Sequence, residues 1–247
     1  MSAIPFQQAK LVELHCLEPV FFASRELSDT YYTEGLIGNY ALAYALGWVN
    51  SPYRLQGQAT GKPSYKEDFI SIKNTCYILP ASPKNNKVNF RFERFNALSD
   101  AYWYAMTNNR VATAREDVPL HRQGKKPNSF RPSNFPQTGR LRMIERGNIF
   151  QTLVFGDCEL LPYIRVGKFM SKVKVSVINT FNVTLLPFGE YTTQFYLNSA
   201  DLPPIEAFSF DLISMAPAPI IKNLRFRGAA WQVGEAIVPA GLSFCGQ

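Results

Sequence analysis

The first clear alternation between apolar and polar positions lies in residues 10–24 and predicts a β-strand. Val12, Leu14 and Cys16 fall on one face of such a strand, whereas several positions of the other face are polar. Pro19 cannot donate a hydrogen bond to a neighbouring strand, so it marks an edge position or the end of the strand. We therefore expect a strand with one buried face near the N-terminus.

Apolar residues then recur at helical spacing in residues 33–49, which predicts a mostly buried helix. Thr33 is suited to cap the first turn, and Glu34 would lie at the positive end of the helix dipole. The residue before Pro52 disfavours helical geometry, so we expect the helix to end there.

Strands dominate the rest of the pattern. Residues 69–80 and 87–95 predict a strand pair joined by a turn at residues 82–86, and residues 101–106 predict a short helix. Further strands are expected in five segments: 147–156, 160–167, 172–186, 191–197 and 220–231. Prolines interrupt residues 202–219, and the pattern there stays ambiguous.

This order of elements predicts an α+β fold. A strand, a helix, two strands and a second helix favour a ferredoxin-like, RRM-like βαββαβ core with extra strands. We expect residues 1–109 and 148–247 to form a single body that is interrupted by an inserted segment at residues 110–147.

Positive charge is concentrated in that inserted segment. The chain has a formal net charge of +7. Residues 110–147 contain nine Lys and Arg against three acidic residues, and the remaining chain contains 17 basic and 16 acidic residues. The segment therefore supplies +6 of the surplus, which favours a contact surface for a polyanion. Six cations fall in its acid-free part: Arg122, Lys125, Lys126, Arg131, Arg140 and Arg142.

The four cysteines are far apart in the sequence, so they form neither a zinc motif nor a redox dithiol, and we expect no disulfide. The N-terminus has no apolar signal core, and no apolar run approaches the length of about 18 residues that a membrane helix needs. We expect a cytoplasmic protein without a membrane segment, a metal or a cofactor.

Signals for catalysis are weak. The chain has two histidines: His15 lies in a predicted strand beside Glu13, and His121 lies in the basic segment. No nucleophile elbow, Walker loop, zinc-protease motif or dinucleotide fingerprint occurs. A non-catalytic protein is therefore expected, and the alternative is a metal-independent endoribonuclease that uses His121, or His15 with a lysine.

Three basic stretches favour nucleic acid as the partner. The first is the acid-free part of the inserted segment, where phenylalanines could stack on bases. The second contains Arg165, Gly167, Lys168 and Lys172, and the third contains Arg225 and Arg227. The alternation of Lys and Arg with apolar residues is equally typical of an ordinary strand with a solvated face. The same explanation is preferred for the "FRFERF" stretch at residues 90–95.

Three stretches together resemble a known family: "PVFFASRELSDTYYTEGLIGNYALAYALGWVNSPYR", "FERFNALSDAYWYAM" and "YIRVGKFMSKVKV". They are similar to the CRISPR-associated RAMP proteins of the Cas-five family from type I-D Cascade. The resemblance implies an RRM-like fold in a crRNA-guided surveillance complex. It also implies a subunit that grips the crRNA 5′ handle, caps the filament of backbone RAMP subunits and touches the large subunit near where target DNA enters.

Candidate RNA-binding residues follow from matching those stretches. The resemblance places six residues around the opening loop and the ends of the first helix: Arg25, Tyr31, Tyr32, Thr33, Tyr53 and Arg54. It also implies a role for Gly167 and Lys168, which match the family's "RVGKF"-like stretch. The glycine-rich loop of many RAMP proteins is not evident here. A nucleic-acid-binding module outside CRISPR systems is a third possibility.

Overall fold

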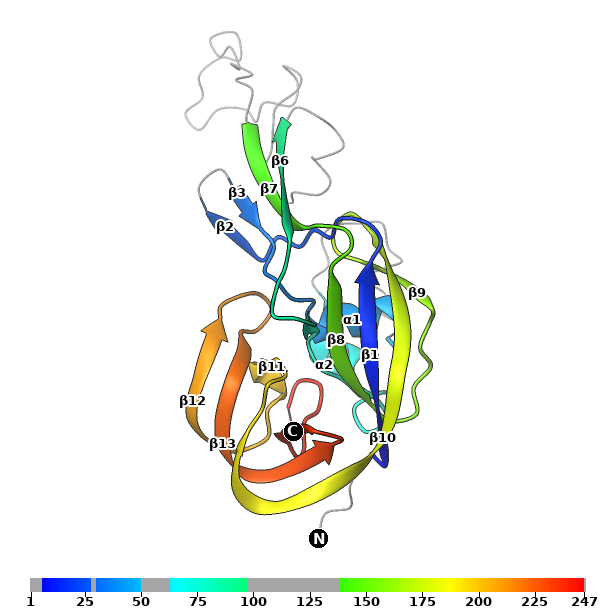
Figure 1. The fold of residues 1–247 in the computed structure, drawn as a ribbon, viewed down its shortest axis with the longest axis vertical. Coiled ribbons are helices and arrows are strands. Elements are labelled where there is room, and N and C mark those ends of the chain that lie inside the picture. Colours follow the sequence, from blue (N-terminus) through cyan, green and yellow to red (C-terminus); the bar gives the residue numbers. More distant parts are fainter. Residues whose placement is uncertain (1–5, 28–29, 50–62, 97–137, 247) are drawn as a thin grey trace, which may run out of the picture.

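A computed structural model describes residues 6–27, 30–49, 63–96 and 138–246, and antiparallel β-sheet dominates it (Figure 1). The strands are β1 (Gln8–Cys16), β2 (Arg25–Leu27), β3 (Thr30–Tyr32), β4 (Tyr77–Ile78), β5 (Ser82–Pro83), β6 (Phe90–Asn96), β7 (Thr138–Ile144), β8 (Ile149–Phe155), β9 (Tyr163–Val166), β10 (Ser171–Thr192), β11 (Leu197–Asn198), β12 (Glu206–Ile213), β13 (Ile220–Val233) and β14 (Ala236–Pro239). The helices are α1 (Asn39–Ala45), α2 (Tyr65–Asp68) and the 3₁₀ helix η3 (Ser199–Asp201).

One long strand, β10, holds the main sheet together. Its first half pairs with β1 and β9, and its second half pairs with β13. In Figure 1, β10 runs beside β1 and then curves beneath the molecule to reach β13. The pairing of β10 with β13 shifts register between Leu186 and Gly189, and such irregularities bend and twist a strand. The resulting order is β11-β13-β10-β1-β8-β4.

A second, four-stranded sheet has the order β2-β3-β7-β6 and projects from the main sheet, as Figure 1 shows. The β3–β7 pairing is parallel, and the β2–β3 and β6–β7 pairings are antiparallel. We call it the small sheet. It has a hydrophobic cluster of its own, formed by Phe21, Tyr31, Leu141 and Met143, which we call the small core.

The main core is rich in aromatic side chains. Phe69 stacks on Phe244 with ring centroids 4.5 Å apart, and Phe155 lies 5.5 Å from Trp231. These rings join the residue after α2 to β8, β13 and the C-terminal residues, so the end of the chain belongs to the core.

The expected ferredoxin-like βαββαβ core is wrong. Within the described residues the α-helices are only α1 and α2, and the strands form mostly antiparallel sheets. The helix predicted over residues 33–49 is reduced to Asn39–Ala45, because Ile37 bridges Ala81 and Thr33 is buried with its hydroxyl bonded to the backbone of Phe22. These local pairings hold the chain extended before the helix begins.

The expected pairing of residues 69–80 with residues 87–95 is also wrong. β4 and β5 both pair with β8, whereas β6 pairs with β7. Most of residues 69–75 form turns, and the proline-rich stretch forms β12. The helix predicted over residues 101–106 lies outside the described residues. The boundaries of the inserted segment stay a prediction, and its final part contains β7.

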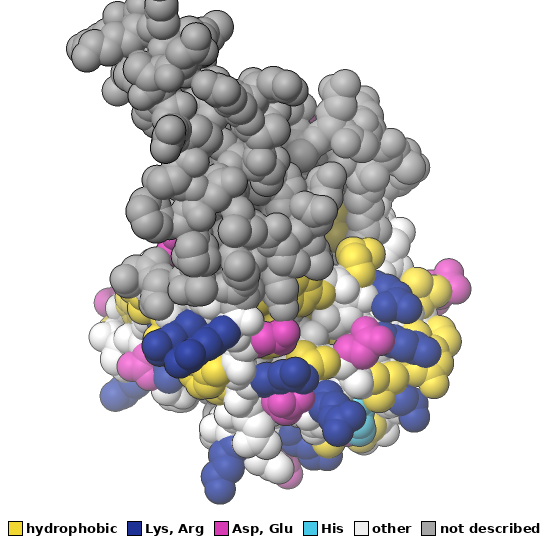
Figure 2. All heavy atoms as spheres, turned by 90° about the horizontal axis from the view of Figure 1, so that it is seen from above, with side chains coloured by type: hydrophobic (Ala, Val, Ile, Leu, Met, Phe, Trp, Pro, Cys, Tyr) yellow, Lys and Arg dark blue, Asp and Glu magenta, His cyan; other side chains and the backbone are white. Residues whose placement is uncertain are grey.

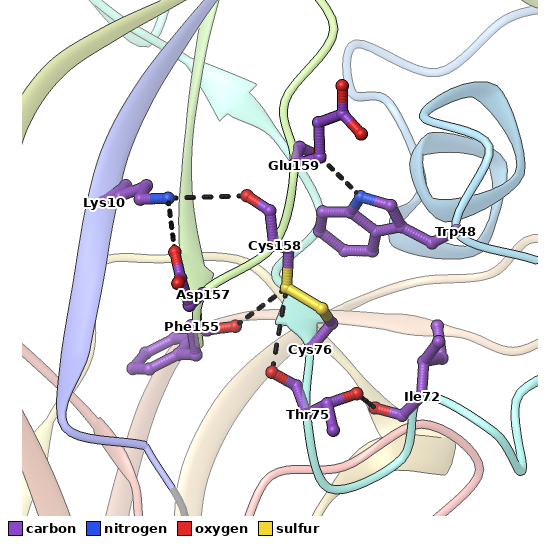
Figure 3. Close-up of a disulfide and its surroundings, with 9 residues drawn as sticks. All are labelled: Lys10, Trp48, Ile72, Thr75, Cys76, Phe155, Asp157, Cys158 and Glu159. Carbon is purple, nitrogen blue, oxygen red and sulfur yellow. Dashed lines mark hydrogen bonds and ion pairs between the residues drawn. A yellow bond between two sulfur atoms is a disulfide. The ribbon is translucent and has the colours of Figure 1, made fainter.

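Contrary to expectation, Cys76 and Cys158 form a disulfide (Figure 3). They are 82 residues apart, but the β4–β8 pairing of Tyr77 with Phe155 brings their Cα atoms to 5.9 Å. Sequence spacing does not reveal such a pairing, because it depends on which strands are neighbours. Cys16 is free and buried.

A buried polar network ties α1 to the C-terminus through Asp201. Its carboxylate accepts hydrogen bonds from Asn39 Nδ2 (2.6 Å), the Tyr40 hydroxyl (2.7 Å), the Tyr77 hydroxyl (3.1 Å) and the Cys245 backbone N–H (2.8 Å). Burial raises the pKa of Asp201 to about 6, although these hydrogen bonds act in the opposite direction.

Replacing both Cys76 and Cys158 by alanine should lower the free energy of unfolding. A cross-link that closes a loop of 82 residues stabilises a chain by about 4.5 kcal/mol through the entropy of the unfolded state. Urea unfolding of the oxidised protein and of the double variant measures the difference. Intact-mass analysis without reductant is the control, and a fully reduced protein of equal stability would contradict the assignment.

The raised pKa of Asp201 predicts that stability falls as pH rises. Between the unfolded pKa of about 3.9 and the folded pKa of about 6, the folded state keeps a proton on Asp201 that the unfolded state has lost. The free energy of unfolding therefore decreases as pH rises across that window. At about 1.4 kcal/mol per pKa unit, the loss is about 3 kcal/mol. Urea unfolding from pH 4 to pH 7 should show this slope in the wild type and a flatter one in Asp201→Asn. The exposed Asp211→Asn should keep the wild-type slope.

Candidate nucleic-acid interface

The small sheet presents two chemically different faces. Tyr31, Leu141 and Met143 point into the small core against Phe21, and each is less than a tenth exposed. Successive residues of a strand point to opposite faces. The residues that alternate with these three therefore project from the other side of the sheet.

The first row across that other side combines two arginines with two aromatic residues. Arg25 pairs with Tyr32, Tyr32 with Arg142, and Arg142 with Phe92, so all four strands contribute one side chain. Cross-strand neighbours share a face of the sheet and lie close together. Phe92 is 62% exposed, although it is a large apolar side chain.

A second row lies beside the first. Leu27 pairs with Thr30, Thr30 with Arg140, and Arg140 with Arg94. We call the surface formed by both rows the basic face. Its members are Arg25, Tyr32, Arg142, Phe92, Leu27, Thr30, Arg140 and Arg94, of which Thr30 is buried.

Electrostatics on the basic face favour an anion. Neither row contains an acidic residue, and Arg25 forms an ion pair with Glu34. Arg94 and Arg140 are direct cross-strand neighbours, and like charges in that arrangement destabilise a sheet. Two adjacent guanidinium groups favour a polyanion as the ligand of this row.

Arg142 is held flat by aromatic rings. Its guanidinium carbon lies 3.6 Å from the ring centroid of Phe90 and 5.3 Å from that of Tyr32. Cation–π contacts of this kind orient a guanidinium without removing its hydrogen-bond donors. The row thus offers a fixed cation between aromatic planes, which suits phosphate and base together.

The turn between β9 and β10 packs against the start of the small sheet. The backbone N–H of Lys168 donates to Phe21 O at 2.8 Å. Gly167 has φ of +73°, and a Cβ there would lie 2.5 Å from the same oxygen, so the position requires glycine. Burial lowers the pKa of Lys168.

Arg165 and Lys172 have intramolecular partners near this turn. Arg165 Nη1 donates to Met170 O at 2.9 Å and lies 3.6 Å from Glu18. The Lys172 ammonium group lies 4.5 Å from the ring centroid of Tyr163. Both side chains are positioned at the surface, but each is already engaged.

Arg225 and Arg227 lie on β13, in the part of the main sheet that pairs with β12 and the end of β10. Arg225 pairs with Glu190 at 3.2 Å, and Arg227 lies 5.6 Å from the ring centroid of Phe188. They belong to a different sheet from the basic face.

The structure therefore gathers some predicted residues and separates others. Arg25, Tyr32, Arg140 and Arg142 meet on the basic face, whereas the Tyr31 and Thr33 side chains are buried. Six predicted residues lie outside the described part of the chain: Tyr53, Arg54, Arg122, Lys125, Lys126 and Arg131.

Sequence patterns did not indicate four residues of the basic face: Arg94, Phe92, Leu27 and Thr30. Arg94 and Phe92 belong to the "FRFERF" stretch, which was assigned to an ordinary half-buried strand. The sequence feature that could have indicated Arg94 and Phe92 is the alternation of aromatic and basic residues in β6. The alternation indicates a binding surface only once β6 is known to pair with β7, which places Arg140 and Arg142 beside these two residues.

Figure 2 views the molecule from above, on the side where the small sheet lies. Lys and Arg side chains there are interspersed with acidic and hydrophobic ones around the grey atoms. The visible surface is thus of mixed charge, and the acid-free rows are a local feature of the small sheet.

A metal site is not indicated: the described residues contain no group of three or more His, Cys, Asp or Glu side chains that could hold an ion.

Comparison with known families identifies the chain. The model of the family described as type I-D CRISPR-associated protein Cas5/Csc1 matches residues 7–247. This chain belongs to the Cas5/Csc1 family. The match confirms the resemblance drawn from the three sequence stretches and covers nearly the whole chain. No curated protein matches the chain. Among the described helices, none has the length and apolar character needed to span a membrane.

Removing one cation from the basic face should weaken binding to single-stranded RNA. If Arg94 contacts a phosphate, Arg94→Gln reduces the magnitude of the slope of log K against log salt by about 0.7. At about 0.15 M salt this change corresponds to an affinity that is about fourfold lower. Fluorescence anisotropy across a salt series measures this change.

Arg91→Gln is the matched control. Arg91 lies on the same strand but points to the opposite face, where it pairs with Glu93 at 3.9 Å. Its removal should leave affinity and slope close to those of the wild type. Equal losses in the two variants would show that binding does not distinguish the faces of the small sheet.

Proposed function

We propose that this chain is the non-catalytic subunit that binds the 5′ handle of the crRNA in a type I-D Cascade surveillance complex in the cytoplasm. Membership in the Cas5/Csc1 family supports the CRISPR context. The observation that carries the RNA-binding role is the basic face, where four arginines and two aromatic residues share two acid-free rows.

The basic face would hold RNA through two kinds of contact. Arginine side chains neutralise phosphates and supply most of the affinity. Tyr32 and Phe92 offer aromatic planes on which splayed bases stack. Lys168 and Gly167 at the adjacent turn extend this contact toward the main sheet, because the turn is bonded to Phe21 at the start of the small sheet.

The same proposal includes contacts within the complex. In it, the subunit caps the filament of backbone RAMP subunits and touches the large subunit near where target DNA enters. Arg122, Lys125, Lys126 and Arg131 would reach a neighbouring subunit, the crRNA or target DNA. Phe188 and Leu212, which are 70% and 56% exposed on the C-terminal strands, fit a protein that works inside an assembly.

The arrangement around His15 supports a structural role rather than catalysis. Its Nε2 atom lies 3.3 Å from Glu13, and the Glu13 carboxylate also accepts from Gln151 and pairs with Lys84. The histidine is thus tied into a charged network on the sheet. We propose that the subunit does not cut RNA and that another subunit processes the crRNA.

Affinity purification from cells tests the proposal directly. The tagged chain should bring down RAMP partners and short RNAs that share one 5′ sequence. A variant that replaces Arg94, Arg140 and Arg142 with glutamine should recover less RNA, while Arg91→Gln recovers the wild-type amount. Recovery of RNA without a common 5′ end would instead support a general nucleic-acid-binding module.

Incubation with labelled repeat RNA separates this proposal from the endoribonuclease alternative. The purified protein should leave the RNA intact with or without a metal chelator, because His15 is held in the charged network of Glu13. His121→Ala and His15→Ala are the controls. Cleavage by the wild type that either substitution abolishes would overturn the non-catalytic assignment.

A further inference from the structure

A hollow of about 430 Å³ lies between α1, the segment that leads into β2, and the turn between β9 and β10. Its volume falls within the range of about 300–1,000 Å³ that is typical of small-molecule sites. Aromatic side chains contribute much of the lining, including Phe22, Tyr44 and Tyr65. We call it the α1 pocket.

Most polar groups of the α1 pocket are already engaged within the protein. Asn39 and Tyr40 donate to Asp201, and Asn198 Nδ2 donates to Asn39 at 3.0 Å. The Tyr44 hydroxyl donates to Asp68. Few hydrogen-bonding groups of the pocket therefore remain to recognise the edge of one particular ligand. Its aromatic and aliphatic surfaces favour a flat apolar ring.

Lys168 is the exception among the described residues that line the pocket. It is their one charged side chain, and its ammonium group has no ion pair or hydrogen bond within the described part of the chain. The protein partly desolvates this cation, which lowers its pKa. A partly desolvated cation without a counter-charge favours an anion at the same place.

The α1 pocket and the basic face are joined along the chain. Phe22 and Ser24 line the pocket, and the next residue, Arg25, begins the first row of the basic face. Lys168 is bonded through its backbone to Phe21, which belongs to the small core beneath that face. Residues 22–25 therefore connect the lining of the pocket to the first row of the basic face.

We propose that the α1 pocket receives one base of the bound single-stranded RNA, whose phosphate pairs with Lys168, and that it does so without selecting the identity of the base. This inference rests on the proposed RNA-binding function and adds a specific site to it. The chemistry required is a planar ring next to a phosphate, which every nucleotide provides.

Filling the pocket tests the proposal. Ala41 lines it from α1, so Ala41→Trp should occupy the space of the base and weaken binding of a labelled oligouridine of about 16 nucleotides by about tenfold. Ala41→Ser keeps the pocket open and should bind like the wild type. Circular dichroism and thermal melting establish that both variants are folded.

Removing the charge of Lys168 tests the proposed phosphate contact at the same site. Lys168→Gln should reduce the salt slope by about 0.7. Lys10→Gln is the matched control. Lys10 pairs with Thr180, whereas Cys16, at the other end of β1, pairs with Val173 near the start of β10, which follows the turn that holds Lys168. Removing the Lys10 charge should therefore have little effect on RNA binding. Because Ala41→Trp and Lys168→Gln act on one nucleotide, the double variant should lose less than the sum of the two. Oligoadenosine should give the same ratios as oligouridine.

The outcomes separate this site from the proposed function as a whole. If Ala41→Trp and Lys168→Gln keep wild-type RNA affinity while Arg94→Gln loses it, the pocket inference fails and RNA binding stands. If Ala41→Trp keeps RNA but loses its protein partners on purification from cells, the pocket receives a polypeptide and the inference is overturned. If the wild type binds neither oligonucleotide, both proposals fail.

Discussion

Everything inferred about RNA binding depends on the small core. Because Tyr31, Leu141 and Met143 are buried against Phe21, strand alternation forces the intervening residues to the opposite face. A shift of one residue in the register would place the arginines of β7 in the core and its apolar residues in solvent. The free energy of burying a few apolar side chains thus fixes the position of every cation on the basic face.

The second constraint is the close contact between the small sheet and the main sheet at Phe21. Its ring belongs to the small core, and its carbonyl oxygen accepts from Lys168 in the turn that precedes β10. Gly167 permits this approach, since a side chain there would collide with the same oxygen. The turn thereby places Lys168 in the lining of the α1 pocket, together with residues of α1.

Sequence patterns predicted local features better than long-range ones. The alternation in β1, the family and the basic character of β7 were all evident along the chain. The fold was wrong because strand partners are set by packing between distant segments: β6 pairs with β7 rather than with the strand that precedes it. The same dependence hid the disulfide of Cys76 with Cys158 and the contribution of Arg94 to the basic face.

Cross-linking of the intact complex to guide RNA that carries photoreactive uridines tests the central claim most directly. Peptides should be mapped by mass spectrometry. The account predicts adducts on the exposed side of β3 and β6, at Tyr32 and Phe92. Adducts confined to the opposite side of the small sheet, or to β12 and β13 with none on the small sheet, would contradict it.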